Sequence, residues 1–169
     1  MNASETEPND ELDRLAWETC GVVDLDTSAF VIGDARTFAR WRRAAEWHPF
    51  SRAPAERLFT YGTGEDAVYP VEKAVRGSRV VAVRVELVDD LAEVAGQWQD
   101  REMLTIGTTG CVVIDPCHEP AAGDLRTACT GDRVVFANGY PIGSLVAVPA
   151  GRWRVQTFQR IGVRLLSVR

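Results

Sequence analysis

The sequence lacks the long apolar run that a membrane helix requires. No stretch approaches the roughly 20 consecutive apolar residues that cross a bilayer. The first 14 residues are acidic and have neither the basic start nor the apolar core of a secretory signal. The expectation is therefore a cytoplasmic protein with no membrane partner.

Histidines are few, and the cysteines are not paired in the way that metal knuckles require. The chain has two histidines and four cysteines, and no C-x-x-C. Reduced thiols at Cys20, Cys111, Cys117 and Cys129 suit the cytoplasm. A zinc site can be drawn from Cys111, Cys117, His118 and Cys129, but its intervals match no ligand knuckle, and Cys111 lies in an apolar run. The sequence therefore predicts no metal and no cofactor.

The motifs of serine and cysteine hydrolases are also missing. There is no Gly-x-Ser-x-Gly segment. Cys117 next to His118 is a candidate nucleophile and base, but neighbours in sequence usually point in different directions. The alternative is a turn thiol beside a solvated imidazole. We therefore expect a non-catalytic protein, with these two residues as weak catalytic candidates.

Two carboxylate arrangements suggest acid–base chemistry. Residues 23–28, VDLDTS, resemble the Asp-Thr-Ser element of aspartic proteases, but Gly107 stands where the partner carboxylate would be, which excludes a shared proton. Asp34 and Asp115 form a second pair, each after an apolar strand. They are a hydrolytic dyad if they converge, and turn-capping residues if they do not.

A weak internal repeat organises the chain. Residues 22–35 and 103–117 share an apolar strand, a bend and a second strand that ends in aspartate, so that Asp34 matches Asp115. The match predicts two similar halves, 22–88 and 103–169, although two unrelated hairpins would look alike. The fold class is α+β, mainly β, with both halves packed as one domain, 10–169, after a flexible acidic tail, 1–9.

Three segments have the apolar spacing of helices. They lie near residues 10–19, 35–46 and 90–100, where apolar side chains recur at intervals of three and four. Asn9 precedes the first segment and Asp89 or Asp90 the third as candidate caps. The sequence therefore predicts about three helices beside the strands.

Charge is uneven along the chain. The net charge is −5, yet residues 1–26 hold eight acids and one arginine, whereas residues 151–169 hold five arginines and no acid. Those arginines alternate along the last strands, which is typical of a solvated sheet face, and the overall charge repels phosphate. Nucleic-acid binding is therefore disfavoured.

The surface best suited to a partner lies on the 35–46 helix and just beyond it. Aromatic side chains beside arginine are enriched in binding interfaces. Alternatively, the two tryptophans cover the sheet. The predicted partner-binding residues are Trp41, Arg42, Arg43, Trp47, His48 and Phe50.

Two short motifs resemble uncharacterised bacterial proteins of β-rich build. The run GTTGCVVIDP and the later LVAVPAGRWRV contain a Thr-Gly bend, a strand, Asp-Pro, and Val-Pro-x-Gly followed by an aromatic residue and valine. The resemblance covers residues 104–157. It implies a β-rich domain and transfers no catalytic residue.

These features together predict a non-catalytic binding protein with a protein partner. An immunity or antitoxin type would use exposed carboxylates or the Trp–Arg helix against a basic partner. The alternative is a small-ligand-binding protein or a hydrolase with a cleft between the two halves, which would use Asp34, Asp115, Cys117 or His118.

Overall fold

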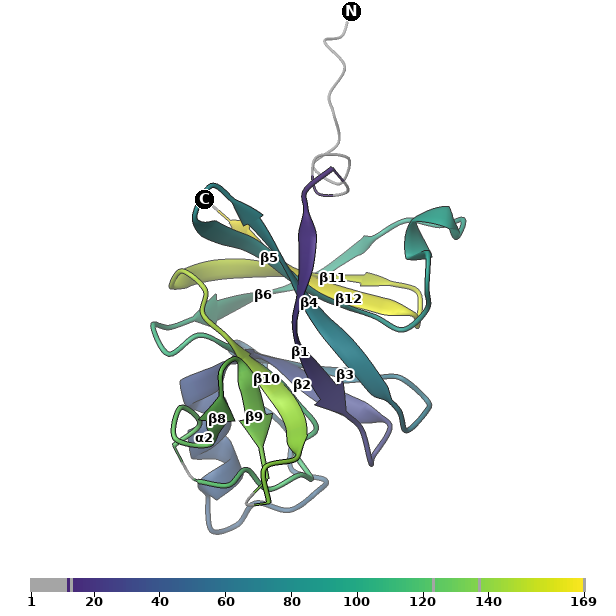
Figure 1. The fold of residues 1–169 in the computed structure, drawn as a ribbon. Coiled ribbons are helices and arrows are strands. Elements are labelled where there is room, and N and C mark those ends of the chain that lie inside the picture. Colours follow the sequence, from purple (N-terminus) through teal and green to yellow (C-terminus); the bar gives the residue numbers. More distant parts are fainter. Residues whose placement is uncertain (1–11, 13, 123, 137, 169) are drawn as a thin grey trace, which may run out of the picture.

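The protein is built from two antiparallel β-sheets, seen in a computed structural model (Figure 1). The structure describes residues 12, 14–122, 124–136 and 138–168. The prediction of a mainly β fold is confirmed for these residues. The acidic tail predicted for residues 1–9 lies outside them.

Each sheet contains six strands within the described residues, and all paired strands are antiparallel. Sheet A has the spatial order β1 (Trp17–Asp24), β4 (Val68–Arg76), β5 (Arg79–Glu86), β12 (Gly162–Val168), β11 (Gly151–Phe158) and β6 (Gln99–Ile106). Sheet B has the order β3 (Leu58–Gly62), β2 (Ala29–Asp34), β7 (Cys111–Ile114), β10 (Pro141–Val146), β9 (Arg133–Val135) and β8 (Cys129–Thr130).

Strands from the first and second halves are arranged symmetrically in sheet A but not in sheet B. In sheet A the central pair is β5 and β12, flanked by β4 and β11 and then by β1 and β6. In sheet B, β2 and β7 from the two halves are neighbours, but one strand, β3, lies beyond β2, whereas three, β10, β9 and β8, lie beyond β7. The order in sheet A is compatible with a duplicated unit. The internal repeat itself stays a prediction.

The main core lies between the sheets and draws on both halves. Phe30 and Ile32 of β2 enter it beside Cys111 and Val113 of β7. Trp153 of β11 is 1% exposed in the same cluster, and its indole nitrogen donates to the Pro149 carbonyl. Burying side chains of this size stabilises a fold by about 1.5–3 kcal/mol each. The halves therefore share one apolar interior.

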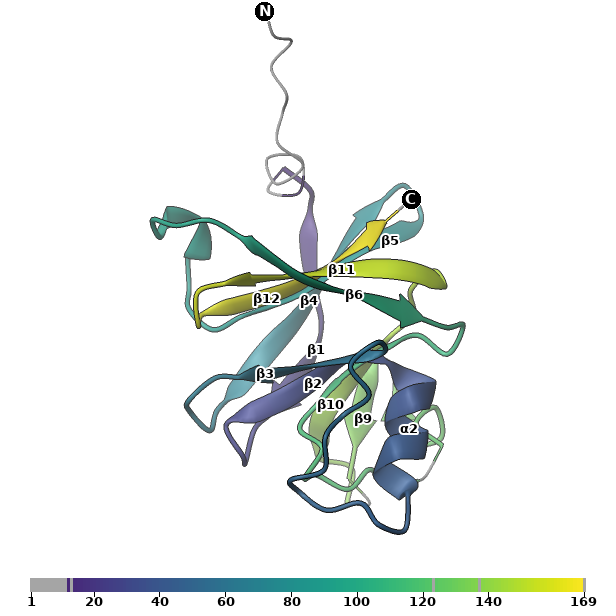
Figure 2. The same cartoon turned by 180° about the vertical axis from the view of Figure 1, so that it is seen from behind.

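The strands β2, β7 and β10 of sheet B are buried on both faces, which explains why their sequences are largely apolar. Val31 and Val112 point away from the main core and pack on Phe38 of α2 (Ala35–Arg43). Figure 2 shows α2 beside the lower sheet, next to β9 and β10. The helix begins at Ala35 because the Asp34 side chain accepts from the Thr37 amide, and it ends at Arg43, where Ala44 is extended.

The prediction of about three helices is wrong in number. Within the described residues α2 is the one α-helix apart from the single helical residue Leu12, and it is shorter than the predicted 35–46. The 10–19 segment is strand from Trp17 onward, because Trp17 and Glu18 pair with β4, and the Trp17 ring also lies 3.9 Å from the Arg84 guanidinium. Residues 10, 11 and 13 lie outside the described part of the chain.

The 90–100 segment is also not an α-helix. It contains a single 3-10 turn, η1 (Leu91–Glu93), and β6 begins at Gln99. Asp90 has a left-handed backbone with φ 56°, and Gly96 has φ 147°, which breaks helical continuity. Trp98 is held instead against Phe158, at 5.5 Å between ring centroids.

The arginines of the last strands do not form one solvated face. Arg152 and Arg154 are exposed, but Arg164 is 1% exposed and donates to the Gln156 side chain. Its guanidinium also lies over the Trp98 ring, 4.0 Å from the centroid. An arginine that packs on an aromatic ring and bonds within the sheet can be buried, and sequence alternation alone does not reveal this.

In the described part of the chain, no helix is long and apolar enough to cross a membrane.

Candidate functional site

Asp34 anchors the corner where β2 meets α2. Its Oδ1 accepts from the Gly107 amide at 2.8 Å, and its Oδ2 accepts from the amide and hydroxyl of Thr37. The side chain is 3% exposed. Because Gly107 precedes β7, this one carboxylate ties the start of α2 to the second half of the chain.

A polar hollow of about 460 Å³ opens at this corner. Its walls come from both halves of the chain. The cationic members are Arg36, Arg40 and Arg57, all exposed, and the bend at Thr108 and Thr109 faces them. The Asp34 carboxylate is already occupied by amide and hydroxyl donors. The corner is therefore positively charged toward solvent.

Asp115 anchors the equivalent corner after β7. Its Oδ2 accepts from the amides of Asp26 and Thr27, each at 2.9 Å, and from the Thr27 hydroxyl at 2.8 Å. Its Oδ1 accepts from the Cys117 amide at 2.9 Å. Asp115 is fully buried. The carboxylate thus ties the loop before β2 to the turn after β7.

The structure keeps the two predicted carboxylates apart. Asp34 pairs with Cys111 across β2 and β7, whereas Ile114, just before Asp115, pairs with Val31. Asp115 is therefore level with Phe30, four residues from Asp34, which corresponds to about 13 Å along a strand. Two carboxylates at that separation, each saturated with backbone donors, act as anchors and do not share a substrate proton.

Asp115, Cys117 and His118 lie together, but not as a nucleophile with its base. Burial, with a contribution from the Asp115 carboxylate, raises the pKa of the Cys117 thiol, which disfavours a thiolate. The His118 ring stands edge-on to Phe136 at 5.1 Å, and its Nε2 faces Asp26 Oδ2 at 3.6 Å. The imidazole therefore faces a carboxylate.

The zinc set drawn from the sequence is not assembled by the cysteines. All four thiols are free, and Cys111 is fully buried in the main core. Burial raises the pKa of Cys111 to about 12. In the described residues the group with metal-ligand spacing is instead Asp24, Asp26 and His118, whose candidate ligand atoms lie within 4.8 Å of one another.

The six residues predicted to bind a partner divide into two sets. Arg42 lies over the Trp47 ring at 3.8 Å and donates from Nε to the Pro116 carbonyl, while Trp41 packs edge-on to Trp47. These side chains fasten α2 to the turn after Asp115. The second set is exposed: Arg43, His48 and Phe50, of which Phe50 is 91% exposed.

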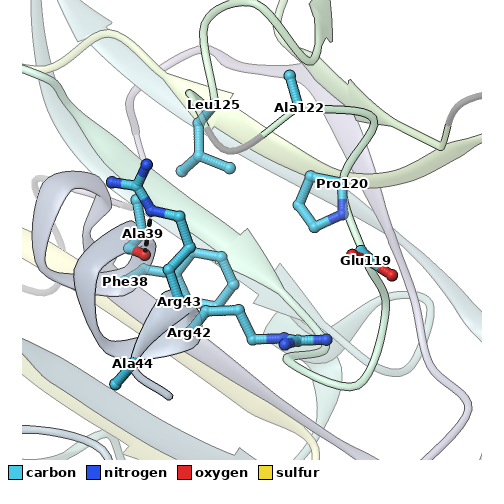
Figure 3. Close-up of a pocket in the computed structure, with 9 residues that line it drawn as sticks. All are labelled: Phe38, Ala39, Arg42, Arg43, Ala44, Glu119, Pro120, Ala122 and Leu125. Atoms are coloured by element: carbon cyan, nitrogen blue, oxygen red, sulfur yellow. Dashed lines mark hydrogen bonds between the residues drawn. The ribbon is translucent and has the colours of Figure 1, made fainter. Parts of the chain in front are cut away.

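A second hollow, of about 490 Å³, lies between α2 and the segment that contributes Glu119, Pro120, Ala122 and Leu125 (Figure 3). Apolar atoms of Phe38, Pro120, Ala122 and Leu125 line its interior. Its rim carries Arg42, Arg43 and Glu119. The Arg43 guanidinium is positioned by a bond from Nε to the Ala39 carbonyl at 3.0 Å. The hollow combines apolar surface with fixed positive charge.

No family model, curated protein or solved structure matches this chain. The resemblance to β-rich bacterial proteins therefore gives no family assignment. The two corners and the hollows are the basis for functional inference.

Sequence reasoning missed several residues of these sites. In the sequence, Asp24 and Asp26 stand out only as part of a protease-like element, although two acids at alternate positions beside a strand end are a signal for ligand-bearing loops. Arg57 carries no local signal, because it reaches the Asp34 corner through the pairing of β3 with β2.

Proposed function

We propose that this is a non-catalytic protein that binds another protein through the α2 surface. The α2 surface comprises the hollow of Figure 3 together with exposed Arg43, His48 and Phe50. The hollow supports the proposal most directly, because apolar walls beside guanidinium groups suit a partner that inserts an apolar side chain next to a carboxylate.

Charge on α2 defines the kind of partner. The last turn carries Arg40, Arg42 and Arg43, and the helix has no acid in its first turn. The protein as a whole is acidic, with a net charge of −5. Because the rest of the protein is acidic, the cationic patch attracts the negatively charged part of an approaching partner and so orients that partner. The surface therefore suits an acidic partner segment, and not the basic partner expected from net charge.

The exposed aromatic side chain supplies the second contact. Phe50 stands on the segment after α2, and its amide donates to Nδ1 of His48 at 3.1 Å. The local bond fixes this loop without burying the ring. A large apolar side chain that is exposed in the free protein contributes binding free energy when a partner covers it.

Affinity purification from the native host with three forms of the chain tests this proposal. The forms are wild type, the double variant R43E/F50S, and the control V68S/R79E, whose changes are exposed on sheet A. We expect one partner at about equal stoichiometry with wild type and control, reduced at least tenfold with R43E/F50S. Equal recovery with all three forms, or equal loss from the control, would contradict the α2 surface.

The hollow at Asp34 favours a second candidate function, the binding of a small anion. Arg36, Arg40 and Arg57 converge there from one half, and the 107–109 bend closes it from the other. This candidate corresponds to the alternative of a small-ligand-binding protein with a cleft between the two halves. Calorimetric titration with inorganic phosphate tests it: binding should be weakened by R57Q and unchanged by R79Q. Absence of heat with wild type removes this candidate.

A further inference from the structure

We propose that Asp24, Asp26 and His118 bind one divalent transition-metal cation, of the class represented by Zn²⁺. Asp24 is the last residue of β1, Asp26 lies in the following loop, and His118 lies in the turn after β7. The site is separate from the hollow of Figure 3 and goes beyond the proposed partner binding.

The spacing of the ligand atoms suits such a cation. One imidazole nitrogen and two carboxylate oxygens lie within 4.8 Å of one another. The His118 Nε2 and the Asp26 Oδ2 are 3.6 Å apart. Ligands bound at about 2.1 Å to a tetrahedral cation are separated by about 3.4 Å. Small side-chain rotations therefore bring all three atoms to bonding distance.

A buried nitrogen provides an independent reason to expect a ligand. His118 is 5% exposed, and its Nε2 is inaccessible to solvent without a hydrogen-bond partner in the described part of the chain. The Asp26 carboxylate at 3.6 Å is too distant for a hydrogen bond. Buried polar atoms are normally satisfied, and a cation between this nitrogen and the carboxylates would satisfy it.

The segments that carry the ligands are held in place without the metal. The Asp115 carboxylate accepts hydrogen bonds from the amide of Asp26, which is itself a proposed ligand, and from the amide of Cys117, which precedes the ligand His118. The His118 amide in turn donates to the Asp115 carbonyl at 3.1 Å. A buried carboxylate that fixes the ligand-bearing backbone reduces the ordering that cation binding must impose. Asp115 is thus a positioning residue for the site.

The donor set selects the class of cation. Mg²⁺ and Ca²⁺ favour sites made of oxygen ligands, whereas imidazole favours zinc, copper, iron and nickel. A site with one imidazole nitrogen and two carboxylates therefore favours a transition-metal cation over Mg²⁺ or Ca²⁺. Three protein ligands also leave a coordination position for water or for a group from a partner.

Untagged full-length protein titrated with ZnCl₂ tests the proposal, by calorimetry and by imidazole ¹H–¹⁵N correlation spectra. We expect one Zn²⁺ per chain, with the shift confined to His118 and absent from His48, the only other histidine. D26N and D24N should each weaken binding at least about tenfold. D89N removes the same charge from an exposed residue on another loop and should leave affinity unchanged.

D26N is a mild change, because the Asp26 side chain is 71% exposed and its backbone amide still reaches Asp115. Thermal unfolding of each variant without zinc checks that the fold is retained. Binding that persists in D24N and D26N at wild-type affinity places the cation elsewhere, on the thiols for example, and overturns the proposal. So does a titration with no stoichiometric binding or no His118 shift, which would leave His118 and Asp26 as an ion pair only.

Discussion

At the end of β2, the Asp34 carboxylate accepts a hydrogen bond from the Gly107 amide in the second half of the chain. After β7, the Asp115 carboxylate accepts hydrogen bonds from the Asp26 and Thr27 amides in the first half. The two anchors are 81 residues apart, and so are the donor loops at Asp26 and Gly107. In each case a buried aspartate at a strand end fixes the loop that precedes the partner strand. The scaffold at the two corners is therefore equivalent.

The segments after the two anchors differ. After Asp34 the chain enters α2, whose first residues are capped by that carboxylate, and Arg36 and Arg40 face the hollow. After Asp115 the chain makes a tight turn that places His118 against Asp26. One corner is cationic and the other combines carboxylates with an imidazole. A shared anchor thus supports two corners of different charge, because the flanking segments supply the charged side chains.

The largest effect should come from Asp115→Ala. The change removes four hydrogen bonds and leaves the amides of Asp26, Thr27 and Cys117 without their acceptor in a buried place. We expect the free energy of unfolding to fall by about 4 kcal/mol. Urea unfolding measures this, and a loss below about 1 kcal/mol would contradict the anchoring role.

Asp34→Ala should cost less than Asp115→Ala. It removes the helix cap at Thr37 and the bond from Gly107, three hydrogen bonds in all. A lost cap costs about 1 kcal/mol and a lost buried bond about the same again, so we expect about 2–3 kcal/mol. Urea unfolding under matched conditions ranks the two variants. The reverse order would contradict the expectation that the number of hydrogen bonds to each carboxylate sets its contribution to stability.

Strands and corners could be predicted from sequence because their signals are local. The apolar runs before Asp34 and Asp115 indicate buried strands, and the aspartates indicate capped ends. The helix expected at 90–100 failed because the left-handed Asp90 and the contact of Trp98 with Phe158 depend on tertiary structure. The helical spacing of apolar residues in a sequence does not show whether tertiary contacts prevent the segment from forming a helix.

The chemistry of the corners was less predictable than their position. Asp115, Cys117 and His118 are close in sequence and are recognisable there as candidates. The approach of His118 to Asp26 joins residues that are 92 positions apart, and the approach of Arg57 to Thr108 depends on strand pairing. Contacts of this range depend on the pairing of β2 with β7 and with β3, which the sequence pattern does not specify.

Thr27 and Thr37 allow a smaller, matched comparison of the two corners. Each hydroxyl donates to the Oδ2 of its aspartate, Thr27 to Asp115 and Thr37 to Asp34. Replacing either by valine removes one bond and keeps the side-chain shape. Each variant should lose about 1 kcal/mol in urea unfolding. A difference of more than about 1 kcal/mol between them would argue against equivalent anchors.

A pH-dependent effect distinguishes the shared interior from the corners. Burial raises the pKa of the Cys20 thiol from 9.0 to about 11. Because the folded-state pKa lies above the unfolded value, the stabilisation by the neutral thiol is complete below pH 9 and is lost between pH 9 and 11. Urea unfolding at about pH 8 and about pH 10.5 should show a decline that is shallower in Cys20→Ser. An unchanged decline in this variant would assign the effect to other groups.

Backbone hydrogen exchange in Asp34→Asn and Asp115→Asn tests the central claim most directly, namely that each buried aspartate anchors the loop of the opposite half. An amide group replaces one accepting oxygen with a donor, so protection should fall at the bonded amides. Because asparagine keeps one accepting oxygen, we expect a loss on one side of each anchor: at Thr37 or Gly107 in Asp34→Asn, and at Cys117 or at both Asp26 and Thr27 in Asp115→Asn. Protection that stays unchanged, or that falls at both corners in either variant, would contradict the claim.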